Sequence, residues 1–453
     1  MKPMKFTNRI IFLVLNLILL VFILFTYINS QNPEKNNLVN VKNINVISYD
    51  KENDKVELVI EINAYEEMCA ISEEENVDYE NLVFQELEDN TCHIIISKKP
   101  YYVYFKNKDN IISQGELIYN YVLTAELKDV YYLALNEIRE FNLKTEELGT
   151  NTITFQIKNS NLVTIKDNLI QGNEIGETEI DIIANNKVIK TTKVIVTDLI
   201  DIPTEFSSKK KFLTCHIYSE EEAELLDKIL ASRIEDAGYG TRAGAVAAAR
   251  FLTLEFPYKI SYFYENGRIN PHGGQNYVDG EGRYYHKGLY LTNNKFKELK
   301  ATLSGPNPWG CKITNWEDNP ADGYIKGVKM PNGLDCSGFV SWDLYNAGFD
   351  PGDNGAGESP YPHQMTDLGH YTKLTNELIY SGKIKPGDLF NFWGHIAIIA
   401  GIDDNNFYVA ESLNTFKGLV LKTYPKKTVN RTFTHVVLMD DYYKEDGNLT
   451  YMW

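Results

Sequence analysis

The chain has 453 residues and a formal net charge of −17, from 62 acidic and 45 basic side chains. A single hydrophobic core rarely covers so long a chain, so we expect about two to four domains. The acidic balance argues against a nucleic-acid groove, because phosphate binding needs clustered lysines and arginines. The only tight basic run, Lys209 to Lys211, is short and is typical of a solvated linker.

The N-terminus carries basic residues followed by an apolar run, Ile10 to Ile28. Such a run is long enough to cross a bilayer as a helix. Positive charge before the run and an acidic chain after it favour a cytoplasmic N-terminus with all later residues outside. We therefore expect residues 1–30 to be an uncleaved membrane anchor. The alternative is a cleaved signal peptide, but the exit from the run, Tyr27-Ile28-Asn29-Ser30-Gln31, is a poor processing site.

Past the anchor, the chain alternates apolar and polar side chains in short runs separated by Asn, Asp and Gly, a pattern that predicts β-strands. In "KVELVIEINAY", Val56, Leu58, Ile60 and Ile62 share one face of a strand. We assign residues 36–120 to a first β-domain. No convergent catalytic set lies in this stretch.

A second β-module, residues 123–198, follows with Thr178, Ile180 and Ile182 on one face of a strand and Val194 and Val196 closing the module. Its run "NSNLVTIKDNLIQGNEIGETEI" resembles bacterial immunoglobulin-like (Big) domains. The resemblance implies an immunoglobulin fold and the role of a spacer or adhesive module.

The five cysteines are Cys69, Cys92, Cys215, Cys311 and Cys336. An odd number outside the cytoplasm leaves at least one thiol unpaired within the chain. Cys69 and Cys92 lie in one β-rich segment and could bridge, as could Cys215 and Cys311, although sequence does not determine the connectivity. No set of residues has zinc-site spacing.

A linker, Leu199 to Lys211, leads into a C-terminal domain, residues 205–453, that mixes helix and strand and whose first residues overlap the linker. Ser219 and Glu222 form the pattern of a capping box at a helix start. The run Ala243 to Phe256 is also helical, and its small residues suit close helix packing.

Cys336 precedes a stretch in which Val340, Leu344 and Ala347 recur at helical spacing. We therefore place Cys336 in the first turn of a helix. The positive end of a helix stabilises a thiolate, so this position predicts a lowered thiol pKa and a nucleophile. The alternative is a cysteine that is simply packed in the core.

A cysteine nucleophile needs a base, and "KIKPGDLFNFWGHIAIIAGIDDNNFYVAES" offers His395 at the head of an alternating strand, followed by a hairpin. Glu411 can orient the imidazole if the two strands pair in the right register. Pairing of Ala400 with Asn406 would leave a five-residue loop and put His395 opposite Glu411, whereas an even-length loop would point them to opposite faces. Asn414 is the reserve orienting residue.

Two motifs together resemble a known family. "LDCSGFV" followed by "KPGDLFNFWGHIAII" is similar to the NlpC-type family of papain-like cell-wall cysteine peptidases. Cys336 and His395 occupy the family's catalytic positions. "PNPWGC" resembles the run upstream of the nucleophile, which implies that Trp309 and the Cys336 backbone line the oxyanion region or groove. The resemblance spans Trp309 to Val437.

Three features depart from the family pattern. Asn307 stands where a tyrosine is usual, and an insertion, Cys311 to Gly333, precedes the nucleophile. Val409 falls near the family's third catalytic residue, a histidine. "AESLN", with Glu411 and Asn414, looks more like the related CHAP amidases and peptidases.

The expected architecture is therefore multidomain: a transmembrane helix, two all-β immunoglobulin-like domains and a C-terminal α+β papain-like domain. The resemblance implies a thiol hydrolase that cuts stem-peptide amide bonds of peptidoglycan and needs no metal or cofactor. The expected anchor places this hydrolase at the outer face of a bacterial cell membrane. Three alternatives stay open: an N-acetylmuramoyl-L-alanine amidase, a transamidase on the same fold, and a non-catalytic wall-binding or adhesive protein. If the β-domains are only spacers, a fragment starting near residue 205 should keep its activity.

Overall fold

The computed structural model describes residues 41–62, 66–113, 115–203, 206, 219–258, 260, 262, 288–289, 312–313, 330–331, 334–352, 354–358, 363–413 and 418–450. The predicted anchor, Ile10 to Ile28, lies outside these residues. No helix within the described ranges is both long and apolar enough to span a membrane.

The chain divides into two compact units. The first holds the residues up to 129, with 141–158 and 179–192; the second holds 130–140, 159–178 and 193–453. The strands predicted for residues 123–198 are thus shared between the two units.

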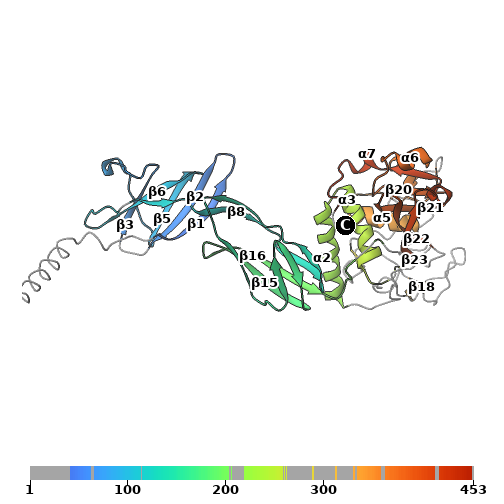
Figure 1. Cartoon of the computed structure of the whole chain (residues 1–453), viewed down its shortest axis with the longest axis horizontal. Coiled ribbons are helices and arrows are strands. Elements are labelled where there is room, and N and C mark those ends of the chain that lie inside the picture. The colour runs from blue at the N-terminus through green and yellow to red at the C-terminus, as the bar shows by residue number, and fades with distance from the viewer. Residues whose placement is uncertain are drawn as a thin grey trace, which may run out of the picture. The chain divides into compact units, whose positions relative to one another are not determined.

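The first unit is built from β-strands, coloured blue to green in Figure 1. One sheet has the order β1-β2-β5 and another the order β4-β3-β6-β7, while β8 pairs with β11 and β12 pairs with β15. The bounds are β1 (Val41–Asp50), β2 (Lys55–Ile62), β3 (Glu66–Ser72), β4 (Gln85–Glu86), β5 (Thr91–Ser97), β6 (Tyr101–Asn107), β7 (Glu116–Ile118), β8 (Tyr121–Glu126), β11 (Lys144–Leu148), β12 (Ile153–Ile157) and β15 (Gly176–Ala184).

Alternation along β2 creates the core of this unit. Val56, Leu58, Ile60 and Ile62 are all buried, as their period of two predicts. They pack in one cluster with residues of β5, β3 and β6. A disulfide joins Cys69 on β3 to Cys92 on β5, so it links the two sheets and confirms the suggested pairing. Cys215 and Cys311 lie outside the described residues.

The second unit begins with β-strands and continues into two helices and a π-helical turn. Strand β16 pairs in parallel with β9, and β10, β14 and β13 form a small sheet. The predicted faces are confirmed: Thr178, Ile180, Ile182, Val194 and Val196 are all buried. The bounds are β9 (Val130–Ala134), β10 (Ile138–Glu140), β13 (Val163–Lys166), β14 (Leu169–Gly172), β16 (Lys187–Thr197), α2 (Glu220–Ala237), α3 (Arg242–Arg250) and a π-helical turn, η3 (Phe251–Glu255).

The predicted capping box is present, because the Ser219 side chain accepts from the backbone of Glu222 while the Glu222 carboxylate accepts from the backbone of Ser219.

The rest of this unit is a six-stranded antiparallel sheet of order β19-β24-β20-β21-β22-β23. Helices α3 and α5 pack against its central strands (Figure 1). The remaining bounds are β17 (Lys312–Ile313), β18 (Met330–Pro331), α5 (Cys336–Asn346), β19 (His370–Lys373), α6 (Asn376–Tyr380), β20 (Leu389–Phe392), β21 (His395–Ile402), β22 (Asn406–Leu413), β23 (Gly418–Pro425), β24 (His435–Leu438) and α7 (Asp440–Tyr443).

Both faces of strand β21 are buried. Ile396, Ile398 and Ala400 belong to the cluster that includes the helices. Ala397 and Ile399 belong to a second cluster with Phe407 and Phe433 on the other face. A strand that is apolar on both faces has no polar side to set its register.

Candidate active site

Cys336 is the first residue of helix α5, as the periodicity predicts. Asp335 is the N-cap, and its Oδ1 atom accepts a hydrogen bond from the backbone N–H of Gly338 across 2.8 Å. Ser412 on β22 donates to the carbonyl of Leu334 across 2.7 Å. These two contacts fix where the helix starts and hold that start against the sheet.

The thiol of Cys336 is buried and lies against the beginning of β21. Its Sγ atom is 3.9 Å from the carbonyl oxygen of Gly394, the residue before His395. Burial, with a smaller contribution from the Asp335 carboxylate, raises the pKa of Cys336 to about 12. The prediction of a lowered pKa was therefore wrong in direction. Backbone N–H groups at the helix start and at Ile396 do favour the thiolate, but desolvation outweighs them.

His395 is the first residue of β21 and is buried. Its backbone carbonyl accepts a hydrogen bond from Nδ2 of Asn391 across 2.9 Å. Its ring lies 4.9 Å from the ring of Phe392 and stacks at 6.2 Å on Phe433, measured between centroids. The aromatic wall leaves the imidazole few alternative orientations.

Glu411 on β22 binds the imidazole directly. Its Oε2 atom lies 2.8 Å from Nε2 of His395, and both side chains are almost fully buried. Its Oε1 atom accepts from the hydroxyl of Tyr424 across 2.6 Å and lies 3.5 Å from Nζ of Lys422. Nζ of Lys422 also donates to the Tyr424 hydroxyl across 2.6 Å. Burial and the nearby Glu411 raise the pKa of Tyr424, so this hydroxyl keeps its proton at neutral pH.

The hairpin that brings His395 and Glu411 together differs from the predicted one. Ile402 pairs with Phe407, so the loop has an even number of residues and the predicted pairing of Ala400 with Asn406 is wrong. Ala400 is an extra residue on β21, because Ile399 pairs with Val409 and Gly401 with Tyr408. This β-bulge reverses the alternation of side chains beyond it. The two residues therefore share a face despite the even loop, and lie diagonally across the strand pair.

The structure brings two of the predicted site residues into contact and places the third beside their strand. Within the described part of the chain, no hydrogen bond joins Sγ of Cys336 to the His395 ring; the thiol instead meets the backbone from Gly394 to Ile396. Catalytic contacts of this kind often tighten only when substrate binds. Asn414 and Trp309 lie outside the described residues.

Sequence reasoning missed Tyr424 and Lys422. Both lie on β23, two residues apart, and so project from the same face of that strand. Lys422 pairs with Val409, and Glu411 pairs with Val420, which puts the lysine, the tyrosine and Glu411 on one face. The alternation in "GLVLKTYP" would have indicated this only with the register of β22 and β23 known.

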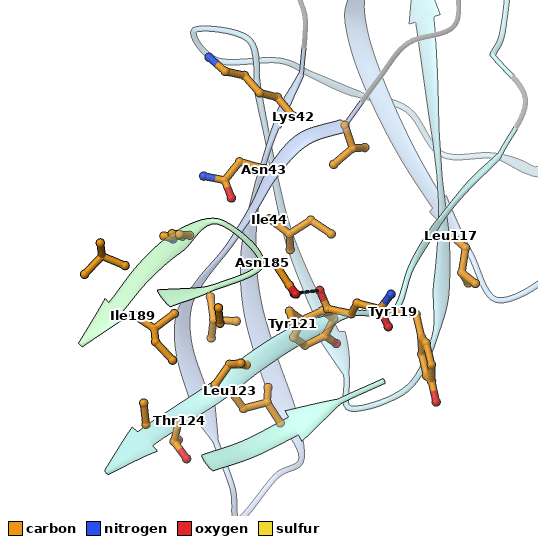
Figure 2. A pocket seen from close by; sticks show the side chains of 18 of the residues that line it. Lys42, Asn43, Ile44, Leu117, Tyr119, Tyr121, Leu123, Thr124, Asn185 and Ile189 are labelled. Atoms are coloured by element: carbon orange, nitrogen blue, oxygen red, sulfur yellow. Dashed lines mark hydrogen bonds between the residues drawn. The ribbon is translucent and has the colours of Figure 1, made fainter. Parts of the chain in front are cut away.

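A cavity of about 420 Å³ lies in the first unit and is drawn in Figure 2. Strands β1 and β8 and the turn around Asn185 line it, and Nδ2 of Asn185 donates to the carbonyl of Asn120 across 3.3 Å. Its described lining contains no cysteine, histidine or serine, so the predicted cysteine–histidine chemistry has no counterpart there. The described residues also include no cluster of three or more potential metal ligands.

Comparison with known proteins adds only distant likenesses. No protein-family profile and no curated protein matches the sequence. Among solved structures, a C-terminal fragment of intimin in complex with the intimin-binding domain of the translocated intimin receptor is 10% identical, with a TM-score of 0.20, covering 39% of this chain and 69% of that one.

A tandem pair of titin immunoglobulin domains is 12% identical, with a TM-score of 0.15, and covers 32% of this chain and 89% of that one. Three N-terminal domains of the outer capsid protein Hoc of bacteriophage RB49 are 11% identical, with a TM-score of 0.15, and cover 35% of this chain and 58% of that one.

Proposed function

We propose that the chain is a cysteine hydrolase that cuts amide bonds in the stem peptides of peptidoglycan. One observation carries the proposal. His395 and Glu411 form a buried pair joined across 2.8 Å, and His395 directly follows Gly394, whose carbonyl oxygen is contacted by Sγ of Cys336. A buried imidazole held by a carboxylate is an arrangement suited to a general base. The sequence resemblance to NlpC-type peptidases supplies the substrate class.

In this proposal His395 removes the thiol proton as Cys336 attacks the carbonyl carbon of the amide. The imidazolium then protonates the leaving amine, and water hydrolyses the thioester to release the acid and the thiol. Because burial raises the pKa of the Cys336 thiol and favours its protonated form, the proton moves to His395 as the thiol attacks. Backbone N–H groups in the first turn of a helix have no partner within it, so the N–H of Cys336 suits the developing oxyanion.

The test uses purified peptidoglycan, incubated with the chain and with its Cys336→Ala variant. Mass spectrometry of the released fragments locates new amine and carboxyl ends, which separates an endopeptidase from an N-acetylmuramoyl-L-alanine amidase. Transfer to an added amine would indicate a transamidase. Identical products from the two proteins would refute a catalytic role for Cys336 and favour a wall-binding or adhesive protein.

We further propose that residues 1–30 anchor the protein in a bacterial cell membrane, with the later domains on the outer side. The charged N-terminus followed by Ile10 to Ile28 supports this placement. Mass spectrometry of protein recovered from membranes tests it. A soluble form that begins near Gln31 would show cleavage and reject the anchor.

A further inference from the structure

Lys422 and Tyr424 on strand β23 form a chain of hydrogen bonds that ends at Glu411. The chemistry of each group determines which one donates and which one accepts. An ammonium group only donates, so in the 2.6 Å contact between Lys422 Nζ and Tyr424 Oη the phenol oxygen accepts. The phenol has one proton. That proton must therefore go to Oε1 of Glu411, which lies 2.6 Å away.

The same reasoning extends to His395. An ionised carboxylate only accepts hydrogen bonds, so the 2.8 Å contact between Oε2 of Glu411 and Nε2 of His395 requires a proton on Nε2. A neutral imidazole carries one N–H. Nδ1 is then left with its lone pair, which is the atom a general base needs.

We propose that Tyr424 and Lys422 are positioning residues that select the Nε2–H tautomer of His395 through Glu411. This inference rests on the proposed function for its catalytic meaning. Its structural basis is independent of that function, because the chain from Lys422 to His395 consists of contacts within the sheet.

Burial makes the hydrogen bond from Tyr424 to Glu411 difficult to replace. Glu411 and His395 are nearly inaccessible to water, and Tyr424 is largely buried with its ring 5.0 Å from that of Phe433. Water therefore does not readily replace a lost donor to Oε1. Without the phenol, Glu411 can turn one oxygen toward Lys422, and its hold on Nε2 weakens.

The experiment uses the full chain labelled with ¹⁵N at histidine, and the His395→Asn variant assigns the His395 signals. In the wild type, Nε2 should show the shift of a protonated ring nitrogen and Nδ1 that of an unprotonated one. In Tyr424→Phe, which keeps the packed ring, the two signals should move toward each other as the tautomers mix. Lys422→Met should cause a smaller movement in the same direction.

Turnover of peptidoglycan provides the second measurement. Loss of a hydrogen bond to a charged group predicts that Tyr424→Phe lowers kcat by about tenfold to a hundredfold with KM within about twofold. Tyr380→Phe and Lys383→Met change exposed side chains of the same types and should match the wild type in both measurements.

The outcomes separate the two proposals. An unchanged His395 tautomer in both Tyr424→Phe and Lys422→Met overturns the positioning role, whatever the activity. Absence of cleavage by the wild type, or equal cleavage by Cys336→Ala, overturns the proposed function, while the tautomer measurement still decides the inference. If Tyr424→Phe fails to fold, the His395 tautomer in Lys422→Met decides whether the positioning role holds.

Discussion

The Nε atom of Arg250 donates a hydrogen bond to the carbonyl of Ala400 across 2.8 Å, at the bulge in strand β21. Both residues are buried. The guanidinium also lies 5.1 Å from the ring of Phe206, which stacks on Tyr408 across from the bulge. Helix α3 thus satisfies the irregular backbone that puts His395 and Glu411 on one face.

Arg250→Met should destabilise the protein by about 1–3 kcal/mol, because the buried carbonyl of Ala400 loses its donor. Urea unfolding followed by circular dichroism measures the change. Lys383→Met, at an exposed position, is the matched control. Equal unfolding midpoints for the wild type and Arg250→Met would show that the bulge is stable without the hydrogen bond from Arg250.

Substitutions in the proposed site should follow a definite order of activity on peptidoglycan. Cys336→Ala should abolish turnover, since the acyl-enzyme no longer forms, and His395→Ala should come close because the thiol loses its base.

Glu411→Gln should be milder. An amide oxygen still accepts from Nε2, but the charge that stabilises the imidazolium is lost. Initial rates of fragment release give the order. A Glu411→Gln variant slower than His395→Ala would contradict an orienting role for the carboxylate.

Alkylation of Cys336 should be slow at neutral pH and should speed up about tenfold per pH unit toward the thiol pKa of about 12. Only the thiolate reacts, and burial keeps its fraction small. The rate of iodoacetamide labelling, resolved by peptide mass spectrometry, measures this profile. A rate that levels off below pH 8 would show a lowered pKa. Because slow alkylation is expected even of a catalytic thiol here, resistance to thiol reagents does not distinguish catalysis from binding.

Asp343 is a fully buried carboxyl group on α5, and neither of its oxygens has a hydrogen-bond partner among the described residues. Burial raises its pKa well above the usual value. The folded state therefore binds more protons than the unfolded state above about pH 4, and its stability falls as the pH rises from there toward the folded pKa.

Asp343→Asn removes this ionisation, so its melting temperature relative to wild type should rise with pH. Each unit by which the pKa is raised corresponds to about 1.4 kcal/mol. Melting temperatures from pH 4 to 8 measure the gap. A constant gap across that range would show that ionisation of Asp343 does not contribute.

The fragment that starts near residue 205 should be less stable than one that starts at residue 123. Arg233 is buried in α2, where it pairs with Glu137 at 3.1 Å and Glu255 at 3.0 Å and donates to the carbonyl of Tyr132. Ala134 and Ile200 share the hydrophobic cluster of the helices. A cut at residue 205 removes Glu137 and Tyr132 as partners of Arg233.

We expect the melting temperature of the shorter fragment to be lower by at least about 3 °C. Cleavage per folded molecule should be equal, since the proposed site lies in both fragments. Equal melting temperatures would support the simpler view that residues 36–198 are separable spacers.

Much of the fold could be read from local patterns. The alternation in Val56 to Ile62, the capping box at Ser219 and the helix that starts at Cys336 all depend on neighbours in the chain, and all three are present. The identity of Cys336, His395 and Glu411 as candidate site residues also came from the sequence, through motif order and the chemistry of the side chains.

The tertiary structure decided how those residues meet. Strand β21 is apolar on both faces, so its pattern does not choose a register. The bulge at Ala400 sets the alternation, and buried Arg250 of helix α3 binds the carbonyl of Ala400. The same holds for the thiol pKa, because the helix start is a local feature while desolvation depends on everything packed around Cys336. Tyr424 and Lys422 reach Glu411 through a strand pairing that no spacing along the chain specifies.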